Sequence, residues 1–221
     1  MRPEIIEIHP VTPQPRLIAK AVKTIADGGV VVYPTDSGYA VGCALENKKG
    51  MDRICQIRDI DKYHNFTLVC SDLSELSNYA VVSDTCFRLM RKHTPGQYTF
   101  ILQATKEVPR RLMNEKRKTI GLRVPDFPIT QAILSGLHAP VMSTSLILPG
   151  NDVPESDPEE IEEKIGKSVD LIIDGGILAA EPTTVIDMAD GEIKIIREGS
   201  GDTAPFLARS PSDIRAFPRN P

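Results

Sequence analysis

Apolar residues along this chain form two kinds of pattern, one typical of strands and one typical of helices, and the two kinds alternate along the sequence. Runs rich in β-branched and aromatic residues predict strands, and apolar residues three and four positions apart predict helices. We expect strands over residues 5–8, 30–33, 66–70, 98–102, 119–124, 141–145, 169–173, 183–188 and 192–197. We expect helices over residues 13–27, 48–58, 83–93, 108–114 and 128–137, and further helices beginning at Asp72 and Asp157. This alternation predicts an α/β protein with one twisted sheet.

The C-terminal part of the chain departs from this alternation. Asp190 and Gly191 separate the last two expected strands, and this dipeptide is a strong hairpin signal, so we expect the sheet to be partly antiparallel there. From Ala204 onward the composition shifts to proline, arginine and serine. We therefore expect a single domain over residues 1–203 and a poorly ordered or docked tail over 204–221.

The strand expected at residues 30–33 leads into a polar cluster of Thr35, Asp36 and Ser37. Pro34 has no N–H group and should stop the strand. Gly38 and Gly42 follow, and glycines let backbone N–H groups approach a ligand closely. The cluster is equally consistent with a capped turn, because such side chains also satisfy turn backbone.

Composition narrows the class of protein. The 221 residues are 41% hydrophobic and 25% charged, as in a globular domain. No apolar run approaches the roughly 20 residues of a membrane span, and the N-terminus does not resemble a signal peptide, so we expect a cytoplasmic protein with no membrane contact. The spread of the four cysteines and four histidines predicts neither a zinc site nor a disulfide framework, although Mg²⁺ carried by a nucleotide would leave no such trace. The cysteines are expected to be small buried residues.

Charge is unevenly distributed. The formal net charge is −4, which argues against nonspecific coating of nucleic acid, yet residues 106–123 are strongly basic. This run is either a solvated helix face or a rim that binds phosphates. The candidate rim residues are Arg110, Arg111, Lys116 and Lys118.

Small hydroxyl residues and arginines gather where the expected strands end. Converging guanidinium and hydroxyl groups suit a phosphate or carboxylate ligand. Neither a P-loop nor a dinucleotide-binding fingerprint is present. Taken singly, each group could also be an ordinary strand end or surface turn. The residues are Thr35, Ser37, Arg123, Ser143, Thr144, Ser145, Thr183, Thr184 and Arg197.

Six segments in order resemble the motif series of the YrdC-like domain family, in its YciO branch, over about residues 15–202. They are residues 34–39 (PTDSGY), 95–99 (PGQYT), 120–125 (IGLRVP), 143–145 (STS), 182–187 (PTTVID) and 196–199 (IREG). The resemblance implies an open, twisted mixed sheet with helices on both faces and a positively charged concave surface. It also implies synthesis of threonylcarbamoyl-AMP from L-threonine, bicarbonate or CO₂, and ATP with Mg²⁺, for a tRNA modification.

The same resemblance assigns site residues. Thr35 and Tyr39 fall where the family holds threonine. Arg123, Ser143 and Ser145 fall in the threonine and nucleotide pocket. Thr183 follows on the neighbouring strand, Arg197 falls where an arginine contacts the nucleotide, and Arg58 falls at the lysine of a Lys-x-Arg motif that meets phosphates.

Two positions depart from the family pattern. Ile60 replaces the arginine of Lys-x-Arg, and Ile147 replaces the asparagine of a Ser-x-Asn motif. A lost charged hydrogen bond costs about 1.5–3 kcal/mol, so the two losses should slow the reaction by roughly two to four powers of ten. Lys62, Lys116 or Lys118 could restore the charge from another direction.

Three functional hypotheses follow. In the first, the pocket binds ATP or AMP, L-threonine or a threonylcarbamoyl-adenosine group, and performs weak or altered chemistry that is synthase-like or hydrolytic. In the second, the chain is a non-catalytic module that binds double-stranded RNA or tRNA through phosphates and 2′-hydroxyls. In the third, the fold is stable and its site is vestigial.

Overall fold

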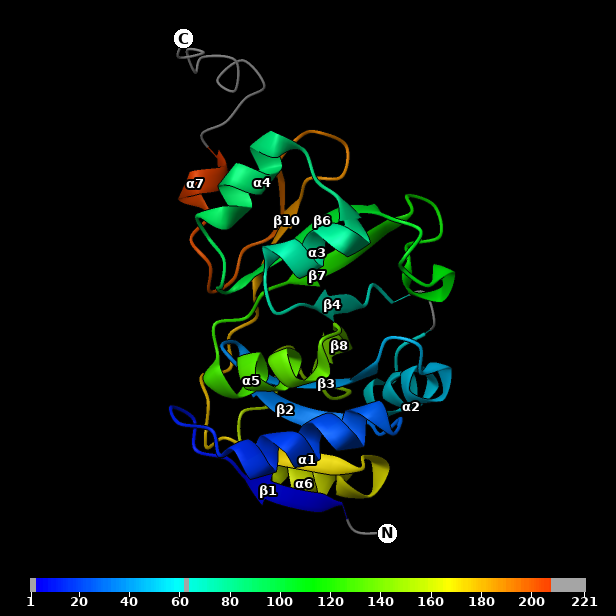
Figure 1. Cartoon of the computed structure of the whole chain (residues 1–221), viewed down its shortest axis with the longest axis vertical. Helices are drawn as coiled ribbons and strands as arrows, with labels where there is room; N and C mark the ends of the chain where they lie inside the picture. The colour runs from blue at the N-terminus through cyan, green and yellow to red at the C-terminus, as the bar shows by residue number, and fades with distance from the viewer. Residues whose placement is uncertain (1–2, 62–63, 208–221) are drawn as a thin grey trace.

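The computed structural model describes residues 3–61 and 64–207, which form one long, bent sheet covered by helices (Figure 1). The strands are β1 (Glu4–Glu7), β2 (Val31–Thr35), β3 (Gly38–Ala44), β4 (Thr67–Val69), β5 (Ala80–Val81), β6 (Tyr98–Ala104), β7 (Thr119–Arg123), β8 (Val141–Ser145), β9 (Leu171–Asp174), β10 (Thr184–Asp187) and β11 (Lys194–Arg197). The helices are α1 (Pro15–Ala26), α2 (Lys48–Arg58), α3 (Leu73–Tyr79), α4 (Asp84–Arg91), α5 (Pro128–Leu137), α6 (Pro158–Ile165) and α7 (Ala204–Leu207), with short 3₁₀ turns η1 (Arg110–Leu112) and η2 (Gly166–Ser168).

The strand order is β1-β9-β2-β3-β8-β4-β7-β6-β10-β11, with β5 paired to β6. Pairs β1–β9, β2–β9, β4–β7 and β6–β10 are parallel. Pairs β2–β3, β3–β8, β4–β8 and β6–β7 are antiparallel, as is the expected hairpin β10–β11. The α/β class and the open mixed sheet are confirmed. Antiparallel pairing, however, lies in the middle of the sheet as well as at the hairpin.

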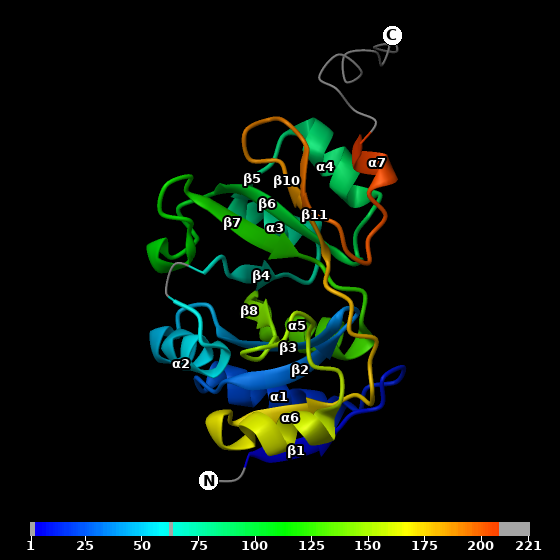
Figure 2. The same ribbon diagram turned by 180° about the vertical axis from the view of Figure 1, so that it is seen from behind.

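The helices cover the two halves of the sheet differently. In the half that contains β1, β9, β2 and β3, α1 and α5 lie on one face (Figure 1) and α2 and α6 on the other (Figure 2). In the half that contains β6, β7 and β10, helices α3, α4 and α7 lie on a single face, and Figure 2 shows the opposite face of these strands uncovered by the described helices. This face therefore carries no layer of described helices over β6, β7 and β10 (Figure 2).

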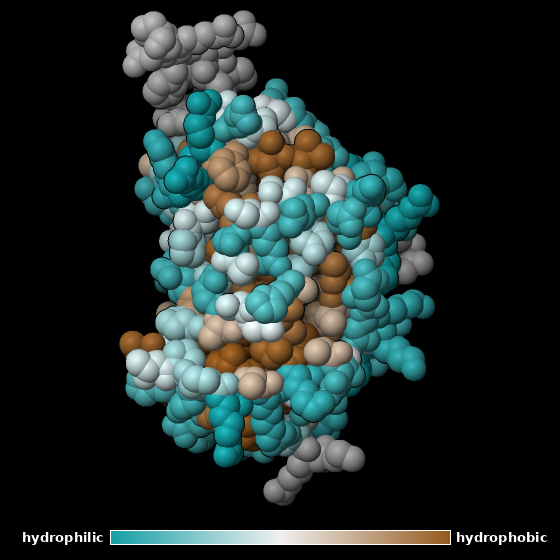
Figure 3. All heavy atoms as spheres, viewed as in Figure 1, coloured by the Kyte–Doolittle hydropathy of each residue, from teal (hydrophilic) through white to brown (hydrophobic). Residues whose placement is uncertain are grey.

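Each helix buries an apolar stripe. On α1 the stripe is Ile18, Ala21 and Ile25, and on α4 it includes Leu89 and Met90. On the face of Figure 1 the remaining apolar residues show in separate patches among hydrophilic ones (Figure 3). None of the described helices is long and apolar enough to cross a membrane.

Three local expectations are corrected by the structure. β3 was not predicted, because its glycines and alanines have low strand propensity, and neither was the two-residue β5. Pro34 does not stop β2: it pairs with Tyr39 of β3, and β9 pairs with β2 only as far as Val32, so the missing N–H costs no bond on that side. The basic helix expected over 108–114 is reduced to the 3₁₀ turn η1.

The chain beyond residue 203 begins with a docked turn. The buried ring of Phe206 on α7 lies against His93, Tyr98 and Phe100, with ring centroids 5.1, 5.4 and 6.3 Å away. Residues 204–207 are therefore packed onto the domain. The rest of the expected tail, 208–221, lies outside the described residues.

Candidate functional site

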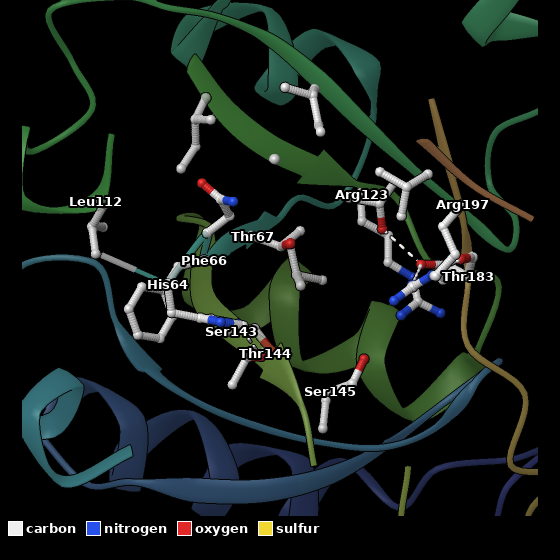
Figure 4. A pocket seen from close by; sticks show the side chains of 18 of the residues that line it. His64, Phe66, Thr67, Leu112, Arg123, Ser143, Thr144, Ser145, Thr183 and Arg197 are labelled. Atoms are coloured by element: carbon white, nitrogen blue, oxygen red, sulfur yellow. Dashed lines mark hydrogen bonds between the residues drawn. The ribbon is translucent and has the colours of Figure 1, made fainter. Parts of the chain in front are cut away.

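A pocket of about 440 Å³ lies on the uncovered face, where β6, β7 and β10 meet β4 and β8. Its floor follows the sheet register: Gly121 on β7 pairs with Thr67 on β4, and Thr67 pairs with Ser143 on β8. A Cβ atom on Gly121 would lie only 3.0 Å from Thr67 Oγ1, so a larger residue at this position would crowd the floor of the pocket. Figure 4 shows the lining side chains in two groups with Ser145 between them.

The first group contains two arginines and lies at one end of the pocket (Figure 4). Arg197 Nε and Nη2 donate to the main-chain oxygen of Thr183, at 3.1 and 2.8 Å, and Thr183 Oγ1 lies 2.9 Å from Thr99 Oγ1. Arg123 forms a buried ion pair with Asp36. Burial and the charge of Arg123 both lower the pKa of Arg197. Two guanidinium groups therefore share this end with a single carboxylate partner.

Asp36 fixes the position of Arg123. Its second carboxylate oxygen accepts a hydrogen bond of 3.0 Å from the backbone N–H of Asp126, and its backbone oxygen accepts one of 2.5 Å from Gln97 Nε2. The carboxylate neutralises Arg123, whereas no described salt bridge pairs Arg197. The uncompensated positive charge at this end consequently belongs to Arg197.

The second group contains His64 and Thr144, which lie away from the two arginines (Figure 4), and Arg58, which is hydrogen-bonded to Thr144. Arg58 Nη1 donates to Thr144 Oγ1 at 2.5 Å, and Arg58 Nε donates to the main-chain oxygen of Ile147 at 2.9 Å. His64 Nε2 lies 3.3 Å from the same Thr144 Oγ1. Burial lowers the pKa of Arg58. No salt bridge among the described residues involves Arg58, so its charge is also available to a ligand.

Several hydroxyl groups that line the pocket are already committed to the fold. Thr35 Oγ1 donates to the main-chain oxygen of Gly38 at 2.7 Å and accepts from the N–H of Ser37 at 3.2 Å. Thr35 therefore caps the turn between β2 and β3, which is one of the two roles that the sequence allows for this polar cluster. Ser143 Oγ accepts from the hydroxyl of Tyr33 at 2.7 Å, and burial raises the pKa of this tyrosine to about 12. Half-buried Ser145 is the lining hydroxyl that projects between the two groups (Figure 4).

The structure brings most of the expected site residues together. The pocket is lined by Thr35, Arg58, Arg123, Ser143, Ser145, Thr183 and Arg197. Tyr39 is not among the lining residues: its buried hydroxyl donates to the oxygen of Gly176 at 2.9 Å and accepts from the N–H of Gly175 at 3.1 Å. Gly42 does not face a ligand either, since it packs against Val141 in the sheet.

The expected phosphate rim does not line the pocket. Arg110, Arg111, Lys116 and Lys118 lie outside the lining residues, and Arg111 Nη2 donates to the main-chain oxygen of Leu45 at 2.8 Å. Arg117 of the same run does line the pocket, but it is paired with Asp187 and Asp190. A role of the rim in binding phosphates stays a prediction.

The two departures from the family pattern differ in placement. Ile60 is half-buried and packs against the hydrophobic core, whereas Ile147 lines the pocket. Lys62, one of the proposed substitutes, lies outside the described residues. Sequence reasoning gave no role to His64, which stands in a connecting loop, or to Tyr33, which was treated only as a strand residue. Asp36 belongs to the polar cluster of residues 35–37, and Thr144 is one of the strand-end hydroxyl residues; the family resemblance assigns a role to neither.

No group of three or more His, Cys, Asp or Glu side chains in the described part of the chain could hold a metal ion. The four cysteines are free thiols, three of them buried. The pocket therefore offers cations, hydroxyls and backbone groups as its means of binding.

Comparisons with known proteins show the family of the chain. A family model for Sua5, YciO and YrdC proteins, described as telomere recombination, matches residues 23–199. The uncharacterized protein YciO of Escherichia coli strain K12 is 60% identical over 200 residues, covering 90% of this chain and 97% of the relative. A putative threonylcarbamoyl-AMP synthase of Methanocaldococcus jannaschii is 28% identical, covering 90% of this chain and 94% of the relative.

Solved structures show the same fold. The crystal structure of E. coli YciO matches with a TM-score of 0.90 and 59% sequence identity, and the match covers 93% of this chain and 100% of the YciO chain. The crystal structure of P. abyssi Sua5 complexed with L-threonine has a TM-score of 0.81 at 21% identity, and covers 88% of this chain and 57% of its own. The second likeness concerns the fold alone.

Proposed function

Because the chain belongs to the Sua5/YciO/YrdC family, we propose that its pocket binds L-threonine and ATP together and carries out a slow reaction of the threonylcarbamoyl-AMP synthase type. The observation that carries this proposal is the placement of two uncompensated cations in one pocket: Arg197 lies at one end (Figure 4), and Arg58 is hydrogen-bonded to Thr144, which lies away from that end. Relatives named as threonylcarbamoyl-AMP synthases and the threonine complex of Sua5 support the choice of ligands.

The proposed chemistry requires placement more than reactive side chains. The ammonium group of threonine loses one proton to solvent, and the resulting amine attacks CO₂ and releases a second proton to solvent as the carbamate forms. A carbamate oxygen then bonds to the α-phosphorus of ATP while the bond to pyrophosphate breaks. Fixed positive charge favours the leaving pyrophosphate, and holding the reactants together lowers the entropic cost. Mg²⁺ enters as part of the ATP–Mg²⁺ substrate and is held chiefly by the phosphates.

The charge balance of the pocket fits this pair of ligands. The ion pair with Asp36 neutralises Arg123, so each end retains about one uncompensated guanidinium. A carboxylate at one end and phosphates at the other would satisfy both. The side chain of Ile147 offers no hydrogen bond at the pocket wall and Ile60 offers no charge, so the rate should be low.

The test is product formation by the purified full chain with ATP, Mg²⁺, L-threonine and bicarbonate. Threonine-dependent release of pyrophosphate and threonylcarbamoyl-AMP supports the proposal, and Arg197→Ala should abolish it. Arg16→Ala, which removes an exposed arginine of α1 far from the pocket, is the matched control. No product above a protein-free blank, together with no binding of ATP by calorimetry, would refute it.

Binding of double-stranded RNA or tRNA is the second candidate. Arg110, Lys116 and Lys118 are exposed, and no salt bridge among the described residues pairs them. Phosphate contacts by such cations make affinity fall steeply with salt. Removing Lys116 and Lys118 together should reduce the slope of log affinity against log salt by roughly two, whereas an unchanged slope would exclude this surface.

A further inference from the structure

The Arg58 end of the pocket lacks one charge that the proposed nucleotide would need. Ile60 packs into the core, and neither Lys116 nor Lys118 lines the pocket. Arg117 does line it, but two aspartates neutralise its charge. Besides Arg58 itself, the titratable group that lines this end and can gain positive charge is His64.

Hydrogen bonding around Thr144 is compatible with a neutral His64 in the free pocket. Thr144 Oγ1 accepts from Arg58 Nη1 at 2.5 Å, so the hydroxyl hydrogen can be donated to His64 Nε2, which lies 3.3 Å away. Nε2 must then be an unprotonated acceptor. The edge contact with Phe66, at 5.5 Å between centroids and 80° between planes, fixes the orientation of the ring.

The surroundings of His64 favour its neutral form. Burial and the positive charge of Arg58 lower the pKa of His64, and the negative charge of Asp61 opposes them. These are the charged groups that act on the ring from α2 and the loop after it, while β8 contributes the neutral hydroxyl of Thr144. A bound anion beside Arg58 would reverse this balance, because it adds negative charge next to the ring.

We propose that His64 takes up a proton from solvent when the phosphates of a nucleotide bind beside Arg58, and so supplies the second positive charge that Ile60 cannot supply. This inference rests on the proposed function. In the bound state Nε2–H donates to a phosphate oxygen, and the hydroxyl hydrogen of Thr144 is released to a second acceptor. Phosphate binding is therefore coupled to one protonation.

The coupling has a definite sign. His64 is neutral in the free protein and charged in the complex, so affinity is greatest at low pH and falls as pH rises toward the pKa of the complex. Each unit by which anion binding raises the pKa of His64 corresponds to a tenfold higher affinity for the anion when His64 is charged than when it is neutral. We expect the affinity for pyrophosphate or ATP–Mg²⁺ to fall about tenfold more between about pH 6 and about pH 8 in the wild type than in His64→Gln.

The experiment is isothermal calorimetry with inorganic pyrophosphate and with ATP–Mg²⁺, in two buffers of different ionisation enthalpy. The wild type should take up about one proton more than His64→Gln. His64→Lys carries a permanent charge and should bind tightly with little dependence on pH. His138→Asn, which replaces an exposed histidine at the end of α5 where a positive φ suits asparagine, is the control and should match the wild type.

Two outcomes overturn the inference. If the wild type binds these anions with the same proton uptake as His64→Gln, then His64 does not titrate on binding. If neither anion binds at either pH, the proposed function and this inference both fail, so the two failures are distinguishable. Proton NMR of the His64 ring, with and without pyrophosphate, measures the same change in the unaltered protein and does not depend on the folding of a variant.

Discussion

The two pocket arginines differ in what holds each guanidinium group. Arg123 is neutralised by a carboxylate, whereas Arg197 donates to a main-chain carbonyl that carries only a partial charge. The carbonyl orients Arg197 without cancelling its charge. Arg197 is consequently the stronger electrostatic contact for an anionic ligand, and Arg123 contributes mainly through its shape and hydrogen-bond donors.

Arg197→Ala should weaken L-threonine binding by about 1.5–3 kcal/mol, the value of a charged hydrogen bond. Arg197→Lys should recover only part of this loss, because an ammonium group cannot reproduce the fork that Thr183 accepts. Calorimetric titration at constant salt measures both effects, with Arg16→Ala as the control. Equal affinity of Arg197→Ala and the wild type would exclude Arg197 from the binding site.

The limits of prediction from sequence are also clearest for single residues. The six motif segments located six residues that do line the pocket, and the separate Lys-x-Arg position located a seventh, Arg58 at the end of α2. The motif segments also selected Tyr39, which does not. Tyr39 and Ala40 are neighbours on β3, and successive side chains of a strand point to opposite faces, so Ala40 lines the pocket while Tyr39 faces the core. This distinction requires knowing that β3 is a strand.

Among the elements, β3 and β8 depend on an unusually close approach. A Cβ atom on Gly42 would lie 2.7 Å from Val141 Cγ1 and 2.8 Å from the main-chain oxygen of Met142. Gly42 therefore packs the centre of the sheet rather than admitting a ligand. The helices whose periodicity was strong, such as α2, begin and end where the pattern predicts, whereas the 108–114 pattern gives only η1, where Arg111 reaches across to Leu45.

Gly42→Ala should lower the free energy of unfolding by about 1–3 kcal/mol, the usual cost of overpacking. The main-chain oxygen of Met142 cannot move without disturbing the β3–β8 pairing. Urea denaturation followed by circular dichroism measures the change. An unaltered midpoint would show that the two strands can separate at no cost.

The ion pair between Asp187 of β10 and Arg117 of the turn before β7 predicts that the stability of the protein depends on pH. Burial alone would raise the pKa of Asp187, but hydrogen bonds from Arg117 and from the N–H of Ala189 lower it below its ordinary value of 3.8. This stabilisation is complete above the ordinary pKa and is lost as pH falls through the lower pKa of the folded state.

Asp187→Asn should remove that part of the acid dependence and cost about 1–3 kcal/mol near neutral pH, since Arg117 then loses its charged partner. Unfolding free energies measured between about pH 3 and about pH 7 test this. The prediction is wrong if the variant and the wild type lose stability in parallel as the pH falls.

For the whole molecule, the expectation from composition placed the end of the domain at residue 203, yet α7 contributes Phe206 to the core. Proline, arginine and serine beyond this point concealed a four-residue turn with one buried ring. A single aromatic residue is too short a signal for periodicity to detect. The overall class was predictable because it depends on many strands and helices at once.

Phe206→Ala should destabilise the molecule by about 3–5 kcal/mol, as expected for a buried aromatic residue. Leu207→Ala is the matched control, because the neighbouring Leu207 is 69% exposed. Thermal unfolding of the two variants should differ clearly. Similar melting temperatures would mean that α7 adds little to the stability of the domain.

The pairing of β9 between β1 and β2 has a consequence for biosynthesis. β1 and β2 leave the ribosome early, but the strand that joins them, Leu171–Asp174, is made much later. At translation rates of about 5–20 residues per second, β2 waits roughly 7–27 s for this partner. The nascent strands β1 and β2 therefore remain unpaired on that side until β9 emerges, and we expect this part of the sheet to form only then.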